Sequence, residues 1–208
     1  MLLMYRLVCT SITAKKLIGE VQMSLAPMNY DFGNASNYSF ATTITCANED
    51  ARKMFVEGFG HMLNFNHEQA IACYMKVAEL DSDCAMAYWG IAYCVSSNYN
   101  WTPGLGSGFD PIQQAISLKA GCSELEQDLI DALAARHSQE ARDAADPSVL
   151  NMGNTPELNA AFAAAMAPLY EKYKGNLDVA AIYVEALMNL KAWQLWDKNT
   201  ETGEITPA

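Results

Sequence analysis

The stretch FNHEQAIACYMKVAELDSDCAMAYWGIAY, from Phe65 to Tyr93, decides the fold of this chain. Its first half places apolar residues three and four positions apart, which is the period of one helical face. The acidic turn Asp81–Asp83 separates this half from a second run that is apolar almost throughout. Because a helix that is apolar all round must be buried between neighbours, the stretch predicts a helical hairpin whose second helix lies in the core.

Helical periods continue on both sides of this hairpin. Asn48 precedes two acidic residues, a combination that caps a helix and suits its dipole, and it predicts a helix that ends near Asn64. Downstream, Ser123 and Glu126 have the spacing of a capping box, and Asn176 is placed to cap a last helix. No run alternates with the two-residue period of a strand. We therefore predict an all-α chain of helical hairpins joined by short turns.

Further helix ends and faces follow from the same signals. Asn66 and Gln69 are spaced as another capping box, with Asn in place of Ser or Thr. Asp110 followed by Pro111 predicts an N-cap and a first helical position. The last helix is expected to turn its apolar residues toward the core, namely Val179, Ile182, Tyr183, Ala186, Leu187 and Leu190.

The chain divides into three regions. Residues 1–47 lack a sustained period and contain a stretch rich in Asn, Ser, Gly and Tyr, which predicts an irregular or partly ordered leader. Residues 48–197 carry the helical periods and form the predicted repeat domain. Residues 198–208 are polar, and we expect them to fray.

Charge is distributed unevenly over these regions. The 208 residues hold 13 Lys and Arg against 24 Asp and Glu, a net charge of −11. Residues 1–46 carry 3 basic and 2 acidic residues, a net +1, so the remaining 10 basic and 22 acidic residues give −12. This acidity argues against nucleic acid and against an anionic membrane surface, and it favours a basic partner. No apolar run is long enough to span a membrane, so we predict a cytoplasmic protein, with secretion as the alternative.

The first helices also contain a repeat signature. Gly58, Ala70 and Tyr74 stand at separations of twelve and four, and adding 34 to Gly58 reaches the small residue Ala92. On these residues, and on the Phe65–Tyr93 stretch, the chain resembles the tetratricopeptide repeat family. More narrowly, it resembles the N-terminal part of larger microbial proteins with such repeats. Ser82 stands where the family usually has Pro, and the period is lost beyond the second unit.

This resemblance implies a short right-handed α-solenoid of stacked helix hairpins. It also implies a concave surface that holds a peptide or partner protein, with no cofactor and no catalysis. Family geometry places the candidate contacts at Asn64, Tyr88, Asn98 and Trp101. Since the related proteins are usually longer, a partial array or a fragment of a larger protein is a further expectation.

An enzyme or a metal-dependent protein is the alternative from another class. His61 and His67 flank the first turn and are candidates to bind a metal together with a cysteine. They lack the spacing of i and i+4 and the third ligand of a helical zinc site. The six cysteines contain no C-x-x-C pair, and we expect them to be buried, reduced thiols. We find no catalytic constellation in the order or spacing of the residues.

Overall fold

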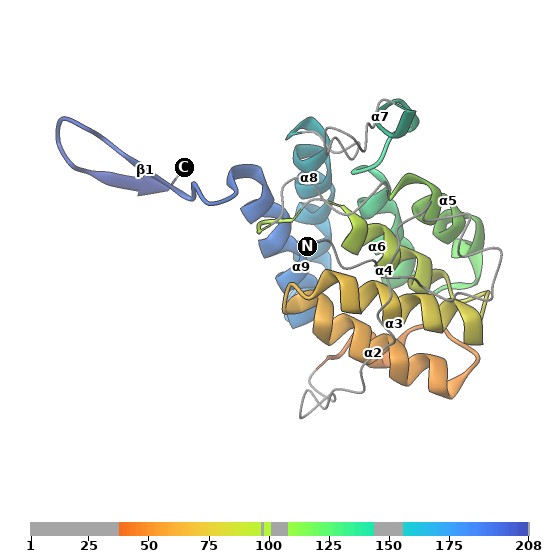
Figure 1. Cartoon of the computed structure of the whole chain (residues 1–208). Coiled ribbons are helices and arrows are strands. Elements are labelled where there is room, and N and C mark those ends of the chain that lie inside the picture. Colours follow the sequence, from red (N-terminus) through yellow and green to blue (C-terminus); the bar gives the residue numbers. More distant parts are fainter. Residues whose placement is uncertain (1–37, 97, 101–107, 144–155, 208) are drawn as a thin grey trace, which may run out of the picture.

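The computed structural model describes residues 38–96, 98–100, 108–143 and 156–207 (Figure 1). The described residues form an all-helical body, followed by a small hairpin. The helices are α2 (Glu49–Leu63), α3 (His67–Leu80), α4 (Ala85–Val95), α5 (Phe109–Leu118), α6 (Glu124–Ala134), α7 (Gln139–Asp143), α8 (Pro156–Lys172) and α9 (Leu177–Met188). Short 3-10 turns lie at Ala41–Thr43, Lys119–Gly121 and Asn189–Lys191, and the strands are β1 (Trp196–Lys198) and β2 (Ile205–Pro207). The predicted all-α class of the body is confirmed.

Each long helix packs against the next one along the chain. Contacts run from α2 to α3, α4, α5 and α6 in turn, and then from α6 to α8 and from α8 to α9 (Figure 1). The helix α4 also contacts α2 and α6, so it has neighbours on several sides. It therefore occupies the middle of the helical body.

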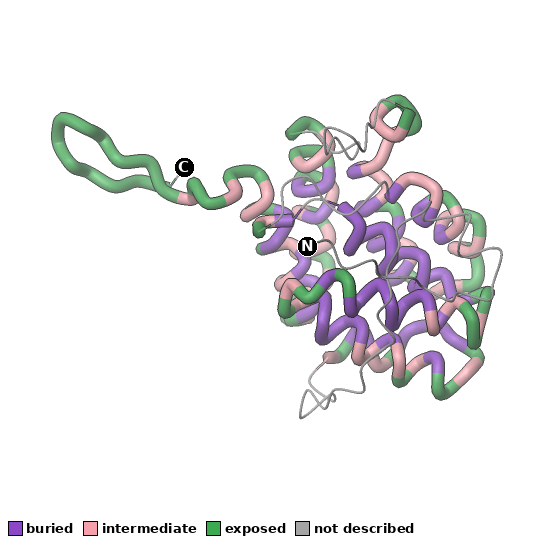
Figure 2. Tube along the Cα trace, in the orientation of Figure 1, coloured by how far each residue is buried: buried purple, intermediate pink, exposed green. Residues whose placement is uncertain are grey.

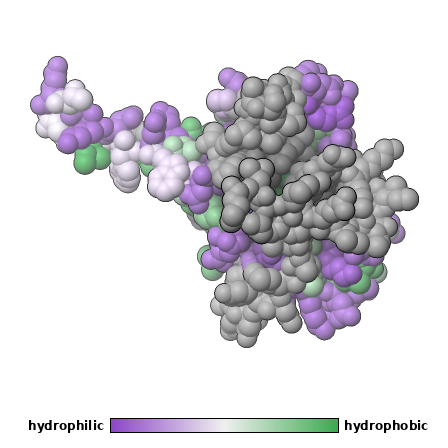
Figure 3. Space-filling view, viewed as in Figure 1, coloured by the Kyte–Doolittle hydropathy of each residue, from purple (hydrophilic) through white to green (hydrophobic). Residues whose placement is uncertain are grey.

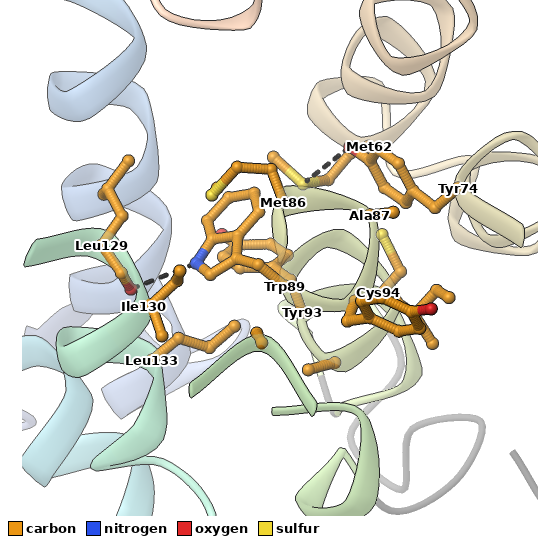
Figure 4. Packing of buried hydrophobic residues seen from close by; sticks show 14 of the residues in the cluster. Met62, Tyr74, Met86, Ala87, Trp89, Tyr93, Cys94, Leu129, Ile130 and Leu133 are labelled. Atoms are coloured by element: carbon orange, nitrogen blue, oxygen red, sulfur yellow. Dashed lines mark hydrogen bonds between the residues drawn. The ribbon is translucent and has the colours of Figure 1, made fainter. Parts of the chain in front are cut away.

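The burial of α4 follows from this position. Every residue from Ala85 to Val95 is buried, and the whole helix is coloured as buried in Figure 2. Trp89 is fully buried, and its indole nitrogen donates a hydrogen bond to the Leu129 carbonyl oxygen of α6 at 3.1 Å (Figure 4). The bond satisfies the one polar atom of the indole ring in the core. The predicted buried helix is thus confirmed.

The repeat-signature residues allow three helices to approach closely. The ring of Tyr74, from α3, lies between Gly58 of α2 and Gly90 of α4. A Cβ atom at Gly58 would lie 2.8 Å from this ring, and one at Gly90 would lie 2.5 Å from it. Ala70 and Ala92 are fully buried as well. Small residues therefore make room for one large aromatic side chain.

Three of the predicted helix caps are confirmed. The side chain of Asn48 accepts hydrogen bonds from the backbone of the first turn of α2, and Asn176 does the same for α9. Ser123 and Glu126 form the predicted capping box at the start of α6. These bonds satisfy backbone donors that have no partner inside the helix.

Two other caps were predicted wrongly. Asn66 makes no capping bond, because the turn before it takes a different path: Phe65 has a φ of +58° and Asn66 has a ψ of 59°, outside the extended conformation of a usual cap. The helix α5 begins at Phe109 after Gly108, so Asp110 lies inside its first turn instead of capping it.

Residues 38–48, which we call the N-terminal strap, comprise the described part of the predicted irregular or partly ordered leader (residues 1–47) and Asn48. The buried side chains of the strap are Phe40, Ala41, Ile44 and Cys46. The ring of Phe40 makes edge contacts with Phe55, Phe59 and Trp89, at centroid distances of 5.6–6.1 Å. The strap is thus part of the hydrophobic core.

Backbone N–H groups fasten the strap to three carboxylates. Phe40 donates to Asp178 of α9, Thr45 to Glu126 of α6, and Ala47 to Asp81 before α4, each at 2.7 Å. Asp178 and Glu126 lie in the first turns of α9 and α6, whereas Asp81 follows the last residue of α3, in the turn before α4. The strap therefore connects α9, α6 and the turn between α3 and α4. The sequence pattern did not reveal it, because three of its polar contacts use backbone N–H groups.

A hairpin replaces the frayed tail and contradicts the prediction that the chain has no strand. Strands β1 and β2 pair antiparallel, with Trp196 opposite Pro207. The side chain of Asn199 accepts hydrogen bonds from the N–H groups of Glu201 and Thr202, and Gly203 supplies a φ of +74°. These features close the turn. All residues of both strands are exposed, and the hairpin projects away from the helices (Figure 1).

Candidate functional site

Large apolar side chains are exposed mainly at one end of the molecule. Among the described residues, seven of the eight that are exposed belong to α9 and the segment after it. We call these seven the C-terminal apolar surface: Leu177, Val184, Leu187, Leu190, Trp193, Trp196 and Ile205. The eighth, Leu80, lies at the end of α3. Grouped exposed apolar residues mark interaction sites more often than scattered ones do.

The helix α9 forms this surface because only one of its sides is covered. Val179, Ile182 and Ala186 face the core and are fully buried, as predicted. Leu187 and Leu190 were also predicted to face the core, and this was wrong: each is 43% exposed. The helix packs mainly on α8, so its second apolar side has no helix against it among the described residues.

Two tryptophans extend the surface beyond α9. Trp193 is 72% exposed and Trp196 is 64% exposed. The ring of Trp193 stacks on Tyr99, which follows α4 in the chain, with centroids 5.2 Å apart. We call residues 192–207, which include the hairpin, the arm. In Figure 3 the arm carries apolar patches among hydrophilic ones. Exposed tryptophans at a defined position are favoured as central contacts in interfaces.

The charged residues of the arm are mostly acidic. Asp197, Glu201 and Glu204 are exposed, with Lys198 as the one base in the same hairpin. Asp197 directly follows Trp196 in the chain, and Glu204 directly precedes Ile205. A partner with basic groups beside an apolar face would complement them.

The four candidate contact residues from the sequence do not share an exposed surface. Asn64 is exposed at the end of α2, whereas Tyr88 is buried and donates its hydroxyl to the Ser82 carbonyl oxygen at 3.1 Å. Asn98 is buried, with its side-chain nitrogen 3.1 Å from Nδ1 of His67. Trp101 lies outside the described residues.

Two histidines flank the C-terminal end of α4. Nδ1 of His67 lies 3.2 Å from the Cys94 carbonyl oxygen, while its Nε2 is buried without a hydrogen-bond partner. Burial, together with the charge of Arg136, lowers the pKa of His67 to about 4. The same two causes lower the pKa of His137 to about 3, and its Nε2 lies 3.4 Å from the Ser96 hydroxyl. Both imidazoles are therefore neutral at pH 7.

A buried acid lies near the same end of α4. The Tyr93 hydroxyl donates to Oε2 of Glu185 from α9 at 2.7 Å. Burial raises the pKa of Glu185. Arg136 is also buried, donates to Asn159 of α8 at 2.9 Å, and holds its guanidinium 5.4 Å from the centroid of the Phe162 ring. These groups connect α4, α8 and α9 inside the protein, which is a structural role.

The histidines proposed for a metal are both in the interior. His61 and His67 are 3% and 5% exposed. Within the described ranges, no three His, Cys, Asp or Glu side chains assemble into a group able to hold a metal ion. Five cysteines are described, all as free thiols; Cys122 is partly exposed and the others are buried. Cys9 lies outside the described residues.

No family model, curated protein or solved structure matches the chain. The tetratricopeptide family therefore stays a resemblance, based on Gly58, Ala70, Tyr74 and Ala92. In the part of the chain that the structure describes, no helix has both the length and the apolar character needed to cross a membrane.

Proposed function

We propose that this protein is a non-catalytic interaction module, a short solenoid of helix hairpins that binds a partner protein on its C-terminal apolar surface. The partner segment is an amphipathic helix with a basic polar face. This keeps the class of function that the tetratricopeptide resemblance implies. It moves the contact from Asn64, Tyr88, Asn98 and Trp101 to α9 and the arm.

The order of helix packing supports the solenoid. Each long helix packs on its successor, and Tyr74 fills the space between small residues of the first three helices. Repeat arrays bury their apolar faces in this way, by stacking each unit on the next. The outward side of the last helix is then the side that the next element of such a stack would cover.

The single observation that carries the binding proposal is the concentration of exposed apolar side chains between Leu177 and Ile205. On α9, Leu177, Val184 and Leu187 stand seven and three residues apart, so they form one stripe along the helix. An amphipathic helix laid along such a stripe buries its own apolar face against it. Trp193 and Trp196 add large side chains at the end of the stripe.

Charge supports a basic partner. The segment 47–208 carries a net charge of −12, and part of this negative charge lies in the exposed hairpin, at Asp197, Glu201 and Glu204. Opposite charge at the border of an apolar contact guides association and selects the partner. Its contribution falls as salt screens the charges.

The test uses a defined probe: a fluorescein-labelled 18-residue helical peptide with leucines on one face and lysines on the other. Fluorescence anisotropy should show saturable binding, with tryptophan emission shifting to shorter wavelength. Leu187→Ser should weaken binding about fivefold to thirtyfold, since burial of one leucine is worth about 1–2 kcal/mol. Raising the salt from 50 to 300 mM should weaken it further.

Two controls separate this mechanism from simple attraction of charges. A peptide of the same composition in scrambled order lacks the apolar face and should bind at least tenfold more weakly. Leu80→Ser removes an exposed leucine away from the surface and should leave affinity unchanged. Equal binding of both peptides, or equal loss in both variants, would contradict the proposal. A dimer in light scattering that Leu187→Ser dissociates would instead assign the surface to self-association.

A further inference from the structure

The C-terminal apolar surface lies next to the place where residues 1–37 join the described part of the chain. The first described residue, Tyr38, stands two positions before Phe40, whose N–H donates to Asp178 at 2.7 Å. Leu177, which directly precedes Asp178 and begins α9, belongs to the C-terminal apolar surface and is 73% exposed. The N-terminal segment is therefore attached beside one end of the apolar stripe on α9.

One window of this segment, residues 14–25, has the sequence of an amphipathic helix. Thr13 precedes the window as an N-cap residue, and Pro27 follows it, where a helix ends. Five of its six apolar residues recur at separations of three, one, three and four, which places them on one side of a helix. These five are Ala14, Leu17, Ile18, Val21 and Leu25, and the sixth, Met23, falls on the opposite side. The period covers these twelve residues and not the leader as a whole.

The window matches α9 in length and can reach all of it. Both have twelve residues, so each is about 18 Å long as a helix. Residues 26–37 connect the window to the strap and can extend to about 40 Å. The shortest route places Leu25 near Leu177 and runs the window antiparallel to α9, so that Lys15 and Lys16 lie toward the arm.

The charges are complementary in this orientation. The window has two lysines at its start, and the exposed hairpin of the arm holds Asp197, Glu201 and Glu204 against Lys198. An apolar side flanked by lysines is also the chemistry of the partner helix in the proposed function. We propose that residues 14–25 bind as a helix to the C-terminal apolar surface of their own chain and compete there with the partner. This inference rests on the proposed function and adds its regulation.

The contact covers the surface for part of the time. A connection of this length gives the window an effective concentration in the millimolar range. Because the window has only one net positive charge, from two lysines and Glu20, we expect a dissociation constant of the same order. The surface is then covered in about half to two-thirds of the molecules, and the apparent affinity for a partner falls about twofold to threefold. Contacts this weak add little to the stability of the fold.

Photo-cross-linking of the full chain tests the contact directly. Val184→p-benzoylphenylalanine places the cross-linker on the outer side of α9, and Leu80→p-benzoylphenylalanine is the matched control at the end of α3. After irradiation at micromolar concentration, mass spectrometry of the monomer should show position 184 joined to residues 14–25, with no such product from position 80. A cross-link from position 184 to a second copy or to another segment, or equal products from both positions, would overturn the inference.

Two variants of the window test the competition. Val21→Asp places a carboxylate on the apolar side, whereas Met23→Asp adds the same charge on the opposite side. Val21→Asp should abolish the cross-link and should bind the fluorescein-labelled helical peptide about twofold to threefold more tightly than the wild type. Met23→Asp should keep the cross-link and the affinity of the wild type. Equal changes in the two variants would show that charge, and not the apolar side, is responsible.

The results also separate this inference from the proposed function. If the labelled peptide binds all variants equally and no cross-link to residues 14–25 forms, the inference is wrong and the partner surface stands. If the cross-link forms but the labelled peptide does not bind even to Val21→Asp, the proposed function is wrong, and the competition with it.

Discussion

The helices α4 and α9 are both rich in apolar residues, yet the structure treats them differently. All residues of α4 are buried, whereas α9 buries one side and exposes Val184 and Leu187 on the other. The difference comes from their neighbours: α4 contacts α2, α3, α5 and α6, while the contacts of α9 are mainly with α8. Apolar composition therefore indicates how much surface a helix has to bury, and packing decides whether it is buried.

The largest difference is expected between two tryptophans. Trp89→Ala should lower the free energy of unfolding by about 4 kcal/mol, because it leaves a cavity in the core and removes the donor to the Leu129 carbonyl. Trp193→Ala should change it by less than about 0.5 kcal/mol, since this side chain is 72% exposed. Urea unfolding followed by circular dichroism measures both. Similar losses in the two variants would remove the distinction between α4 and α9.

Because of the buried histidines near the C-terminal end of α4, the free energy of unfolding should depend on pH in the acidic range. The pKa of His67 is about 4 in the folded protein and 6.5 when unperturbed, so its stabilising contribution is complete above pH 6.5 and is lost as the pH falls toward 4. Between pH 7.5 and 5 this amounts to about 2 kcal/mol. His67→Gln does not titrate, and its stability should fall less over the same range. Parallel curves for wild type and variant would show that His67 does not carry the effect.

A smaller loss of stability is expected from a substitution that disturbs the close packing around α4. Gly90→Ala places a Cβ atom 2.5 Å from the buried Tyr74 ring, which should cost more than the gain in helix propensity and lower stability by about 1–2 kcal/mol. A Cβ atom added at Gly121 would have no atom within 4 Å of it, so Gly121→Ala is the matched control. It should be neutral or slightly stabilising in thermal unfolding. An equally tolerated Gly90→Ala would mean that Tyr74 has room to move.

The smallest change in stability is expected on the outer side of α9. Val184→Ser and Leu187→Ser should each alter the free energy of unfolding by less than about 0.5 kcal/mol, because 54% and 43% of these residues are already exposed. Denaturant midpoints report the change. A loss above about 1.5 kcal/mol would show that this side is buried in solution, for example by a second copy of the chain.

Much of the helical body was predictable from sequence, and the reason is local. Asn48, Ser123 and Asn176 cap helices through bonds to residues two or three positions away, so their spacing suffices. The burial of α4 was predictable because it lacks a polar side altogether. The repeat spacing singled out Tyr74 and Gly58, whereas Gly90 on the other side of the ring was not predicted.

The remaining features depend on distant partners. Periodicity finds the apolar sides of α9, but it does not show whether a helix covers them, so Leu187 and Leu190 were placed wrongly. The strap is bound through backbone N–H groups, which every residue type except proline has, so no side-chain pattern predicts these bonds. Of the candidate contacts, Tyr88 was named from family geometry although it lies in α4, whose burial the composition predicted. Asn98 is buried against His67, which lies 31 residues earlier in the chain, and no local pattern predicts that contact.

The bond from Phe40 to Asp178 joins residues 138 positions apart, and this has a consequence for how the chain folds during synthesis. The strap leaves the ribosome early, but its carboxylate partner in α9 is made much later. Until then the helices that have emerged can pack locally while Phe40 and Ile44 lack part of their final environment. Contacts of such long sequence separation slow folding. We therefore expect docking of the strap onto α9 to be a late step. Nascent chains that end before α9 should expose the apolar side chains of the strap.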